Sequence, residues 1–446
     1  MTGKPQHPPR VKTASREPSI VSIASKQNLD GTLPSPTTAV VQQQQRWNHP
    51  RINVYRTLST FWCFVVLGAN DAALGALIPY LEEYYNLSYT VVSLVFLSPF
   101  VGYAASALLN NYVHHNFGQR GVGIIGPSAH MLAYIISSIH PPFPVLVVIY
   151  ILAGFGNGIS DAAWNAWISD MANANEVMGF LHGFYGLGAT ISPLIATTMI
   201  TKGHLPWYNY YYLMIGFSFI ELVFSSGAFW TATGPVYRAS HVRTTDVKGN
   251  RMKEALFMKP SARITWLTTA FLIGYMGIEV GLGGWITTFM REIRHSSPFA
   301  SGMTATGFWL GMTVGRVVLG FVTPRIGEKR AIIIYIPLAM ALELCFWLIP
   351  QKIVSAVTVA IVGFLLGPLF PAAIVAVSRL LPKHLHVSAI GFAAAAGGGG
   401  AALFPFAVGA IAQAKGVGVL QPIVLALLVV ILLLWLCLPR MGEKEE

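Results

Sequence analysis

Residues 58–80 read LSTFWCFVVLGANDAALGALIPY, and Asp71 is the only charged side chain among them. A helix of about 20 residues crosses the roughly 30 Å hydrocarbon core of a bilayer, because each residue adds about 1.5 Å. Backbone groups find no water in that core, so a helix is the expected spanning structure. The stretch therefore predicts a membrane helix that carries one acid within its span.

Eleven further apolar stretches follow, separated by short loops that carry charge, proline or glycine. The twelve stretches lie at about 58–80, 92–110, 122–139, 145–168, 177–200, 210–232, 264–288, 303–322, 331–349, 353–377, 386–412 and 418–438. Hydrophobic residues make up 54% of the chain and charged residues 11%, against about 25% charged residues in soluble domains. We therefore expect an all-α membrane protein with twelve transmembrane helices.

The connection at 233–263 is the longest between apolar stretches and divides the helices six and six. It predicts an N-terminal half at 56–232 and a C-terminal half at 264–439. Residues 1–55 are rich in Ser, Thr, Pro and Gln and contain no apolar run, so a disordered tail is expected there. A short second tail is expected at 440–446.

The distribution of positive charge predicts the orientation. Of the 29 lysines and arginines, 23 lie in the tails, the long connection and the other loops on that side of the predicted bundle. Cytoplasmic loops carry such an excess, so we expect both tails and the connection in the cytoplasm. The net charge of +11 is then a topology signal, and nucleic acid is not an expected partner. Asn86, in an Asn-Leu-Ser triplet, falls on the outer side and is a candidate glycosylation site.

The two halves resemble each other at an offset of 208 or 209 residues. The matching pairs are Asp71 with Glu279, Gly75 with Gly283, Gly118 with Gly327, Gly154 with Gly363, and Gly158 with Gly367. Two six-helix halves with parallel internal similarity are typical of the major facilitator architecture, in which the substrate site lies between the halves near the midplane.

From about residue 55 to 440 the chain resembles the major facilitator superfamily. The loop GFVTPRIGEKR at 320–330 is similar to that superfamily's loop motif but carries Pro324 where the motif has an acid. Within the superfamily, the chain resembles the fucose/galactose/glucose–proton symporter family and its fungal relatives. This resemblance rests on Gly68–Asp71, Gly75–Pro79, Gly154–Asn157, Asp161, Asn165, Tyr275, Glu279 and Gly283–Trp285.

The resemblance implies a secondary transporter that works by alternating access. Its solute would be small, polar and sugar-like, protons would be coupled, no cofactor would be needed, and the chain would act as a monomer in the lipid bilayer. In bacterial fucose permease one acid in helix 1 and one in helix 4 matter for transport, and Asp71 and Asp161 match them. The plasma membrane is the expected location.

An ionisable group within a span costs on the order of 3 kcal/mol, so each one needs a reason. Burial disfavours the charged form of a carboxyl, so such a group can exchange a proton near neutral pH. We predict that Asp71 and Glu279 couple the proton. The alternative is structural, with a neutral acid hydrogen-bonded to a neighbouring helix or an acid that is salt-bridged. Glu221 and Glu343, on helices expected at the periphery, favour that structural role.

Helix 4 carries Asn157, Asp161 and Asn165 at intervals of four, so all three lie on one face. A polar stripe within a membrane helix must face another helix or a solvated space, and here it predicts substrate contacts. The other candidate contacts are Asn70, Trp164, Tyr275, Trp285 and Arg316. The tryptophans could instead anchor the helices at the membrane interface. Arg316 could pair with Glu279, Asp71 or a substrate carboxylate, or extend to the membrane edge.

Other function classes have less support. We find no nucleotide-binding loop, zinc-protease motif or nucleophile elbow, so ATP drive and enzyme activity are not expected. Gly179, Gly188 and Ser192-Pro193 partly resemble the helix 5 motif of drug–proton antiporters, which keeps export of a small metabolite as an alternative. A membrane sensor that does not transport is the alternative from another class.

Overall fold

The computed structural model describes residue 3 and residues 45–172, 174–240 and 248–439. Most of the predicted tail 1–55, and the predicted tail 440–446, lie outside these residues. The first helix begins at Ile52, four residues before the predicted start of the N-terminal half. Residues 44–446 form one compact unit, and only this unit is described below.

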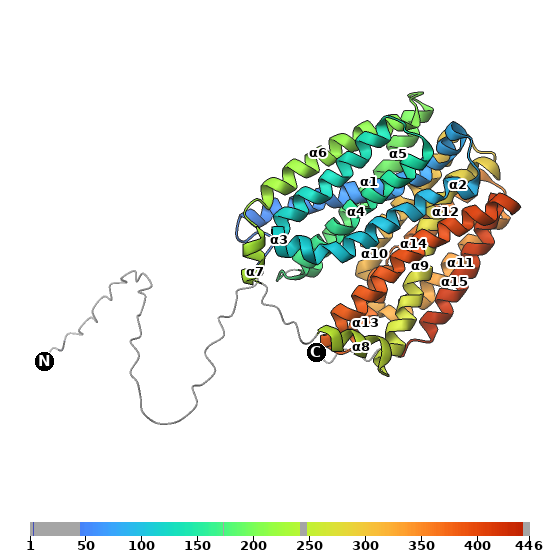
Figure 1. The fold of residues 1–446 in the computed structure, drawn as a ribbon. Helices are drawn as coiled ribbons and strands as arrows, with labels where there is room; N and C mark the ends of the chain where they lie inside the picture. Colours follow the sequence, from blue (N-terminus) through green and yellow to red (C-terminus); the bar gives the residue numbers. More distant parts are fainter. Residues whose placement is uncertain (1–2, 4–44, 173, 241–247, 440–446) are drawn as a thin grey trace. The chain divides into compact units, whose positions relative to one another are not determined.

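Figure 1 shows the arrangement of the helices. The N-terminal half contains α1 (Ile52–Tyr85), α2 (Tyr89–Val92), α3 (Leu94–Ser138), α4 (Phe143–Ser169), α5 (Ala174–Thr201) and α6 (Tyr210–Ala228). The connection contains α7 (Gly234–Ser240) and α8 (Lys248–Phe257). The C-terminal half contains α9 (Ser261–Glu292), α10 (Pro298–Ile326), α11 (Glu328–Leu348), α12 (Lys352–Leu366), α13 (Leu369–Leu380), α14 (His386–Lys415) and α15 (Leu420–Leu436). Three 3-10 turns lie at Trp207–Asn209, Lys383–Leu385 and Val417–Val419.

Among the described residues, 11 helical stretches are long and apolar enough to cross a membrane. One of them, Tyr89–Ser138, has 50 residues and contains two spans. The chain reverses within it at Gly118, whose φ of 69° and ψ of −165° are not helical. Residues before Gly118 pack parallel to α4, with Gly102 against Ile151, and residues after it pack antiparallel, with Gly126 against Ser160. The prediction of twelve membrane helices is therefore confirmed.

The internal repeat reappears as equivalent packing in the two halves. Gly154 of α4 lies against the backbone of Pro99, and its partner Gly363 of α12 lies against the backbone of Phe308, 209 residues later. Gly118 and Gly327 both have positive φ values, 69° and 90°, at equivalent helix breaks. Such values favour glycine because a Cβ would clash with the backbone.

The repeat also brings partners into contact. Gly75 of α1 and Gly283 of α9 approach so closely that a Cβ on Gly75 would meet the Gly283 carbonyl. Two helices can come this near only where neither carries a side chain at the crossing. The repeat partners thus meet each other where the two halves join.

The bundle has two ends. We call the end that carries α7 and α8 the linker end, and the opposite end, where α1 and α9 finish, the far end. Contacts between the halves run from the middle of the helices to the far end. They join Gly75 to Gly283, Thr197 to Gly302 and Ser93 to Gly409, the Tyr89 N–H to Gln413, and Lys202 to the Phe299 ring.

The linker end is less tightly joined. Within the described residues, nothing lies within 4 Å of where a Cβ would stand on Gly179 or Gly183 of α5, Gly320 of α10 or Gly391 of α14. In Figure 1, α7 lies beside the N-terminal half and α8 beside the C-terminal half. The halves are therefore closed against each other at the far end and apart at the linker end.

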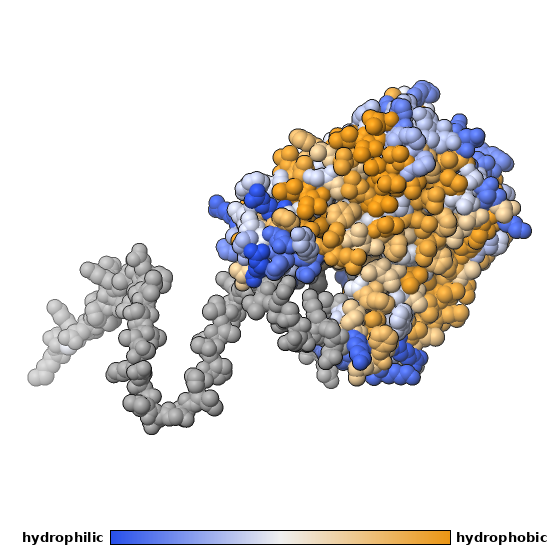
Figure 2. Space-filling view, in the orientation of Figure 1, coloured by the Kyte–Doolittle hydropathy of each residue, from blue (hydrophilic) through white to orange (hydrophobic). Residues whose placement is uncertain are grey.

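The outer surface suits a bilayer. Figure 2 shows hydrophobic residues over most of the visible face, with hydrophilic residues gathered toward the ends of the helices. Large apolar side chains are exposed on this surface, for example Leu108, Phe321 and Ile353, which are 83%, 72% and 79% exposed. Exposed apolar side chains of this size and number indicate contact with lipid. The chain is a multi-pass membrane protein.

Candidate functional site

Asp71 lies in the middle of α1 and accepts hydrogen bonds from three side chains. Its Oδ1 accepts from Asn157 Nδ2 at 2.7 Å and from Asn70 Nδ2 at 3.1 Å. Its Oδ2 accepts from the Tyr185 hydroxyl at 2.9 Å. All three donors are neutral. The same groups can also hold the protonated carboxyl. A hydroxyl can accept a hydrogen bond instead of donating one, and an amide carries both a donor and an acceptor.

Asn70 is itself held by a side chain of α3. The Tyr134 hydroxyl donates to Asn70 Oδ1 at 3.1 Å. Tyr134 is buried in the second span of α3, which packs against α4 and α6. The polar groups around Asp71 therefore come from α1, α3, α4 and α5.

Glu279 in the C-terminal half has a charged partner. Arg316 Nη2 of α10 donates to Glu279 Oε1 of α9 at 2.6 Å, and the two side chains are 18% and 10% exposed. Tyr275 lies one turn before Glu279, fully buried, with its hydroxyl beside the Glu279 carboxylate and the Arg316 guanidinium. Of the partners predicted for Arg316, the structure therefore shows Glu279.

Tyr185 of α5 joins the two acidic groups. Its hydroxyl donates to Asp71, and the Arg316 guanidinium lies over its ring at 5.9 Å from the centroid. Near this point Thr190 and Thr313 contact each other across α5 and α10, with 3.3 Å between their hydroxyls. The acid of one half and the ion pair of the other thus converge on one aromatic side chain.

Asp161 and Asn165 lie further along α4, toward the linker end. Asn165 Nδ2 donates to Asp161 Oδ1 at 2.8 Å and to its backbone oxygen at 2.9 Å. Both side chains are half-buried, as are Asp71 and Tyr185, whereas Asn157 is fully buried. Asp161 and Asn165, which keep part of their surface exposed within a span, are therefore candidate contacts for a solute.

The chain matches the family model described as Major Facilitator Superfamily over residues 60–405 and again over 281–446. The chain belongs to the Major Facilitator Superfamily. Bypass of stop codon protein 6 of Saccharomyces cerevisiae is 30% identical, over 86% of this chain and 82% of that protein. The glucose/mannose transporter GlcP of Bacillus subtilis is 21% identical, over 72% of this chain and 79% of that protein.

A solved structure supports the fold. The xylose transporter XylE from E. coli, in a partially occluded inward open conformation, aligns with a TM-score of 0.67 and 15% identity, over 87% of this chain and 99% of that one. At this identity the likeness shows the fold alone. Superfamily members are transporters, so this chain is a membrane transporter of small molecules and not an enzyme.

Two predicted contacts lie away from Asp71 in this superfamily fold. Trp164 is 1% exposed and stacks on Phe229, the residue that follows α6, with 4.5 Å between ring centroids, inside the N-terminal half. Trp285 is fully buried, and its Nε1 donates to the Pro405 backbone oxygen at 2.8 Å. Its ring packs against Tyr89 of the opposite half, near the far end. Trp285 therefore belongs to the contact that closes the far end.

Asn86 lies at the far end as well. It is exposed and follows α1 in a left-handed conformation, with φ of 52°. Asparagine tolerates this conformation better than most side chains. A triplet in an exposed turn is accessible to a modifying enzyme, and the prediction that Asn86 is glycosylated stays a prediction.

Two functional candidates escaped the sequence analysis. Tyr185 bridges the halves, and Tyr134 supports Asn70. The signal for Tyr185 was its place between Gly183 and Gly186, on a helix whose glycines predict close packing against another helix. Tyr134 gave no comparable signal, because a tyrosine in an apolar stretch is also common at a membrane interface.

The superfamily loop at 320–330 is stabilised by an acid other than the one its motif contains. Pro324 occupies the motif's acid position, and four residues later Glu328 accepts from Arg379 Nη1 of α13 at 2.6 Å. The Lys329 ammonium donates to the carbonyls of Leu438 and Pro439. These contacts stay within the C-terminal half at the linker end.

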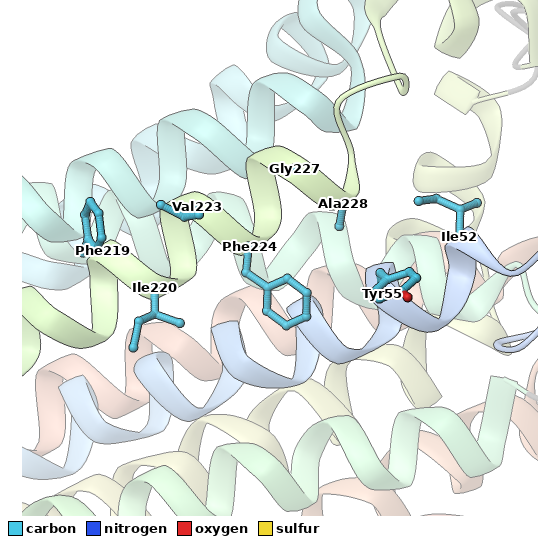
Figure 3. Close-up of a pocket in the computed structure, with 8 residues that line it drawn as sticks. All are labelled: Ile52, Tyr55, Phe219, Ile220, Val223, Phe224, Gly227 and Ala228. Atoms are coloured by element: carbon cyan, nitrogen blue, oxygen red, sulfur yellow. The ribbon is translucent and has the colours of Figure 1, made fainter.

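Two hollows lie away from the Asp71 group. A hollow of about 450 Å³ between the start of α1 and the end of α6 is lined by apolar groups, among them Ile52, Phe219 and Val223 (Figure 3). These side chains are exposed on the outer surface, so the hollow faces lipid. A second hollow of about 250 Å³ lies at the linker end, beside Asn110 and Asp170. In the described part of the chain, no cluster of three or more His, Cys, Asp or Glu side chains could hold a metal ion.

Proposed function

We propose that this superfamily member transports a small, polar, sugar-like organic solute together with protons, by alternating access of the two halves. One observation carries the proposal. Asp71 of one half and the Glu279–Arg316 pair of the other converge on Tyr185. A proton taken up at Asp71 therefore changes the charge at the point where the two halves meet.

Asp71 is the proposed coupling acid because the side chains that donate hydrogen bonds to it are all neutral. A carboxylate held by amides and a hydroxyl gains or loses a full charge when it binds or releases a proton, without breaking an ion pair. Glu279 is the proposed second acid, whose salt bridge with Arg316 opens or tightens as the charge on Asp71 changes. If the two acids are coupled, the binding of a proton is shared between Asp71 and Glu279 and cannot be assigned to either residue alone.

The solute class rests on the donors and acceptors that solvent can reach. Asp161 and Asn165 present carboxylate and amide groups, which bind the hydroxyls of a polyol. The relatives named as glucose/mannose and xylose transporters are consistent with such a solute. Asn70 and Asn157 act through Asp71 in this proposal, since each donates to it.

We further propose that the linker end faces the cytoplasm. The tails and loops that the sequence predicts on this side of the bundle hold 23 of the 29 lysines and arginines, which favours the cytoplasmic side. The separation of the halves at the linker end then corresponds to an inward-facing state in the plasma membrane. A reporter placed near Gly249 and another after Glu446 should both read as cytoplasmic, and an external signal at either site would reject this topology.

The function is tested with the full chain reconstituted in liposomes. Labelled D-glucose, D-mannose and D-xylose are offered with and without an imposed pH gradient, and again with a protonophore. We expect one of these sugars to accumulate with the gradient and to lose its accumulation when the protonophore collapses it. Movement of sugar that ignores the gradient would reject proton coupling, and exclusion of all three sugars would reject the solute class.

Export is the second candidate because of the helix 5 residues. Gly188 lies against the Val65 backbone, and the Ser192 hydroxyl donates to the Ala69 oxygen at 2.7 Å, so this motif-like segment packs on α1 beside Asp71. Liposomes loaded with sugar and given an inward proton gradient separate the directions. Sugar that leaves against its own gradient while protons enter would favour antiport, sugar that accumulates under the same gradient would favour symport, and absence of movement would favour the sensor.

A further inference from the structure

The N-terminal half contains a second buried pair of titratable groups. His130 Nδ1, in the second span of α3, lies 3.0 Å from Glu221 Oε2 of α6, and both side chains are fully buried. An ionisable pair of this kind within a membrane domain is costly and needs a reason. The transport mechanism proposed above does not use it.

The fold makes room for this pair. A Cβ on Gly156 of α4 would stand 2.5 Å from Cδ2 and 2.6 Å from Nε2 of His130, so a glycine is needed where the imidazole meets α4. The Cys63 thiol of α1 lies beside Glu221. Among the described residues, His130 Nε2 has no hydrogen-bond partner. A pair held only for assembly would be expected to have this atom satisfied.

The pair is connected to Asp71 by two side chains. The His130 ring stacks on the Tyr134 ring, with 5.9 Å between centroids and 12° between the planes. The Tyr134 hydroxyl donates to Asn70, which donates to Asp71. Amide and aromatic side chains do not readily transfer protons. We therefore expect this path to couple the pair to Asp71 through electrostatic interaction and through the orientation of its hydrogen bonds.

We propose that His130 and Glu221 form a second proton-binding site, whose occupancy is coupled to that of Asp71. The inference rests on the proposed proton coupling. The pair binds one proton from water and releases it again, without any change in covalent bonds between heavy atoms. With the proton the pair is neutral, either as imidazole and carboxylic acid or as imidazolium and carboxylate. Without it, the pair carries a net charge of −1.

The charged and titratable groups around the pair come from three helices. Those of α1 are Cys63 and Asp71, that of α3 is Tyr134, and those of α6 are Tyr210 and Tyr211. The Ser160 hydroxyl and the Trp164 indole of α4 lie beside the Cys63 thiol. Within the described residues, no lysine or arginine bonds to the pair. Asp71 is therefore the acid whose charge the pair senses, and an ionised Asp71 favours a proton on the pair.

The test is a pH titration of the full chain in lipid nanodiscs, read by infrared difference spectroscopy in the absence of any solute. The double variant His130→Gln/Glu221→Gln keeps side chains that can hydrogen-bond but removes the titration. We expect wild type to show pH-dependent carboxyl or imidazole bands that the double variant lacks. In Asp71→Asn the same bands should move to lower pH by roughly one pH unit, the effect of removing one nearby charge.

Glu343→Gln is the matched control, because Glu343 is also a fully buried carboxyl, with both oxygens unpartnered among the described residues, but lies in α11 of the other half. It should leave the bands of the pair at the wild-type pH. If the double variant does not fold, Glu221→Gln alone tests whether the bands belong to the pair. The shift in Asp71→Asn then tests whether the pair responds to the charge on Asp71. Unchanged bands in the double variant, or bands that ignore Asp71→Asn, would overturn the proposal. Because no sugar is used, the result stands apart from the liposome assay.

Discussion

The two halves of the bundle treat equivalent acids differently. Asp71 of the N-terminal half accepts from two amides and a hydroxyl, whereas its repeat partner Glu279 accepts from the Arg316 guanidinium. The backbone is closely alike, since Gly154 and Gly363 make the same contact in each half. The repeat therefore determines the position of the acid on its helix, and the neighbouring side chains determine how readily the acid binds a proton.

This difference gives the halves separate tasks in the proposed cycle. An acid among neutral donors can be protonated while its surroundings stay in place. An acid paired with a guanidinium resists protonation, because losing its charge would leave a buried cation alone. We infer that the N-terminal half senses the proton and the C-terminal half responds through its ion pair.

Breaking the ion pair should have the largest effect. Glu279→Gln leaves Arg316 buried without an anion, which is expected to destabilise the protein by about 3–5 kcal/mol. Transport by any mode should be lost, and the melting temperature in detergent should fall. The double variant Glu279→Gln/Arg316→Met removes both charges and should regain most of the stability. A single variant as stable as wild type would contradict the assignment of this pair.

Neutralising Asp71 should have a more selective effect. In Asp71→Asn the amide oxygen can still accept from Asn157, and the Tyr185 hydroxyl can turn to accept, so the shape is kept. We expect proton-driven accumulation to fall by at least about tenfold while exchange of labelled for unlabelled sugar stays within about threefold of wild type. Equal loss of both activities would assign Asp71 to solute binding instead.

Asp161 offers a contrast within the same half. It shares an α4 face with Asn165 and is the proposed solute contact, so Asp161→Asn should weaken binding by about five- to tenfold, the difference between a hydrogen bond to a charged group and one to a neutral group. The pH dependence of exchange should not change. Binding of the transported sugar to the purified protein is the measurement, and wild-type affinity would remove Asp161 from the site.

The spans, the repeat and the positions of the acids could be predicted from the sequence, because each depends on a local pattern of residues. A long apolar stretch predicts a span, and a charged residue within it predicts a site that needs a partner. The short helices α7 and α8 of the connection show no such pattern, and the sequence analysis did not predict them.

Which way a side chain faces was harder to predict. Trp164 shares a helix with Asp161 but stacks on Phe229, the residue that follows α6, so its ring faces the interior of the N-terminal half. Asn157 was predicted as a solute contact, yet it is fully buried and donates to Asp71. Both outcomes depend on neighbours far away in the sequence, which no local pattern of residues contains.

The smallest effect is expected at Tyr185, and it tests the link between the halves. Tyr185→Phe removes the hydroxyl that donates to Asp71 but keeps the ring beneath Arg316. One hydrogen bond contributes about 0.5–1.5 kcal/mol, so accumulation should fall by roughly three- to tenfold while the protein stays folded. Tyr185→Leu also removes the ring and should cost more, and the difference between the two variants measures the contact with Arg316. The melting temperature should also fall further in Tyr185→Leu than in Tyr185→Phe, and that extra fall should disappear when Arg316 is already replaced in the Glu279→Gln/Arg316→Met background. If it persists there, the ring acts through packing alone, and the two halves are not connected through Tyr185.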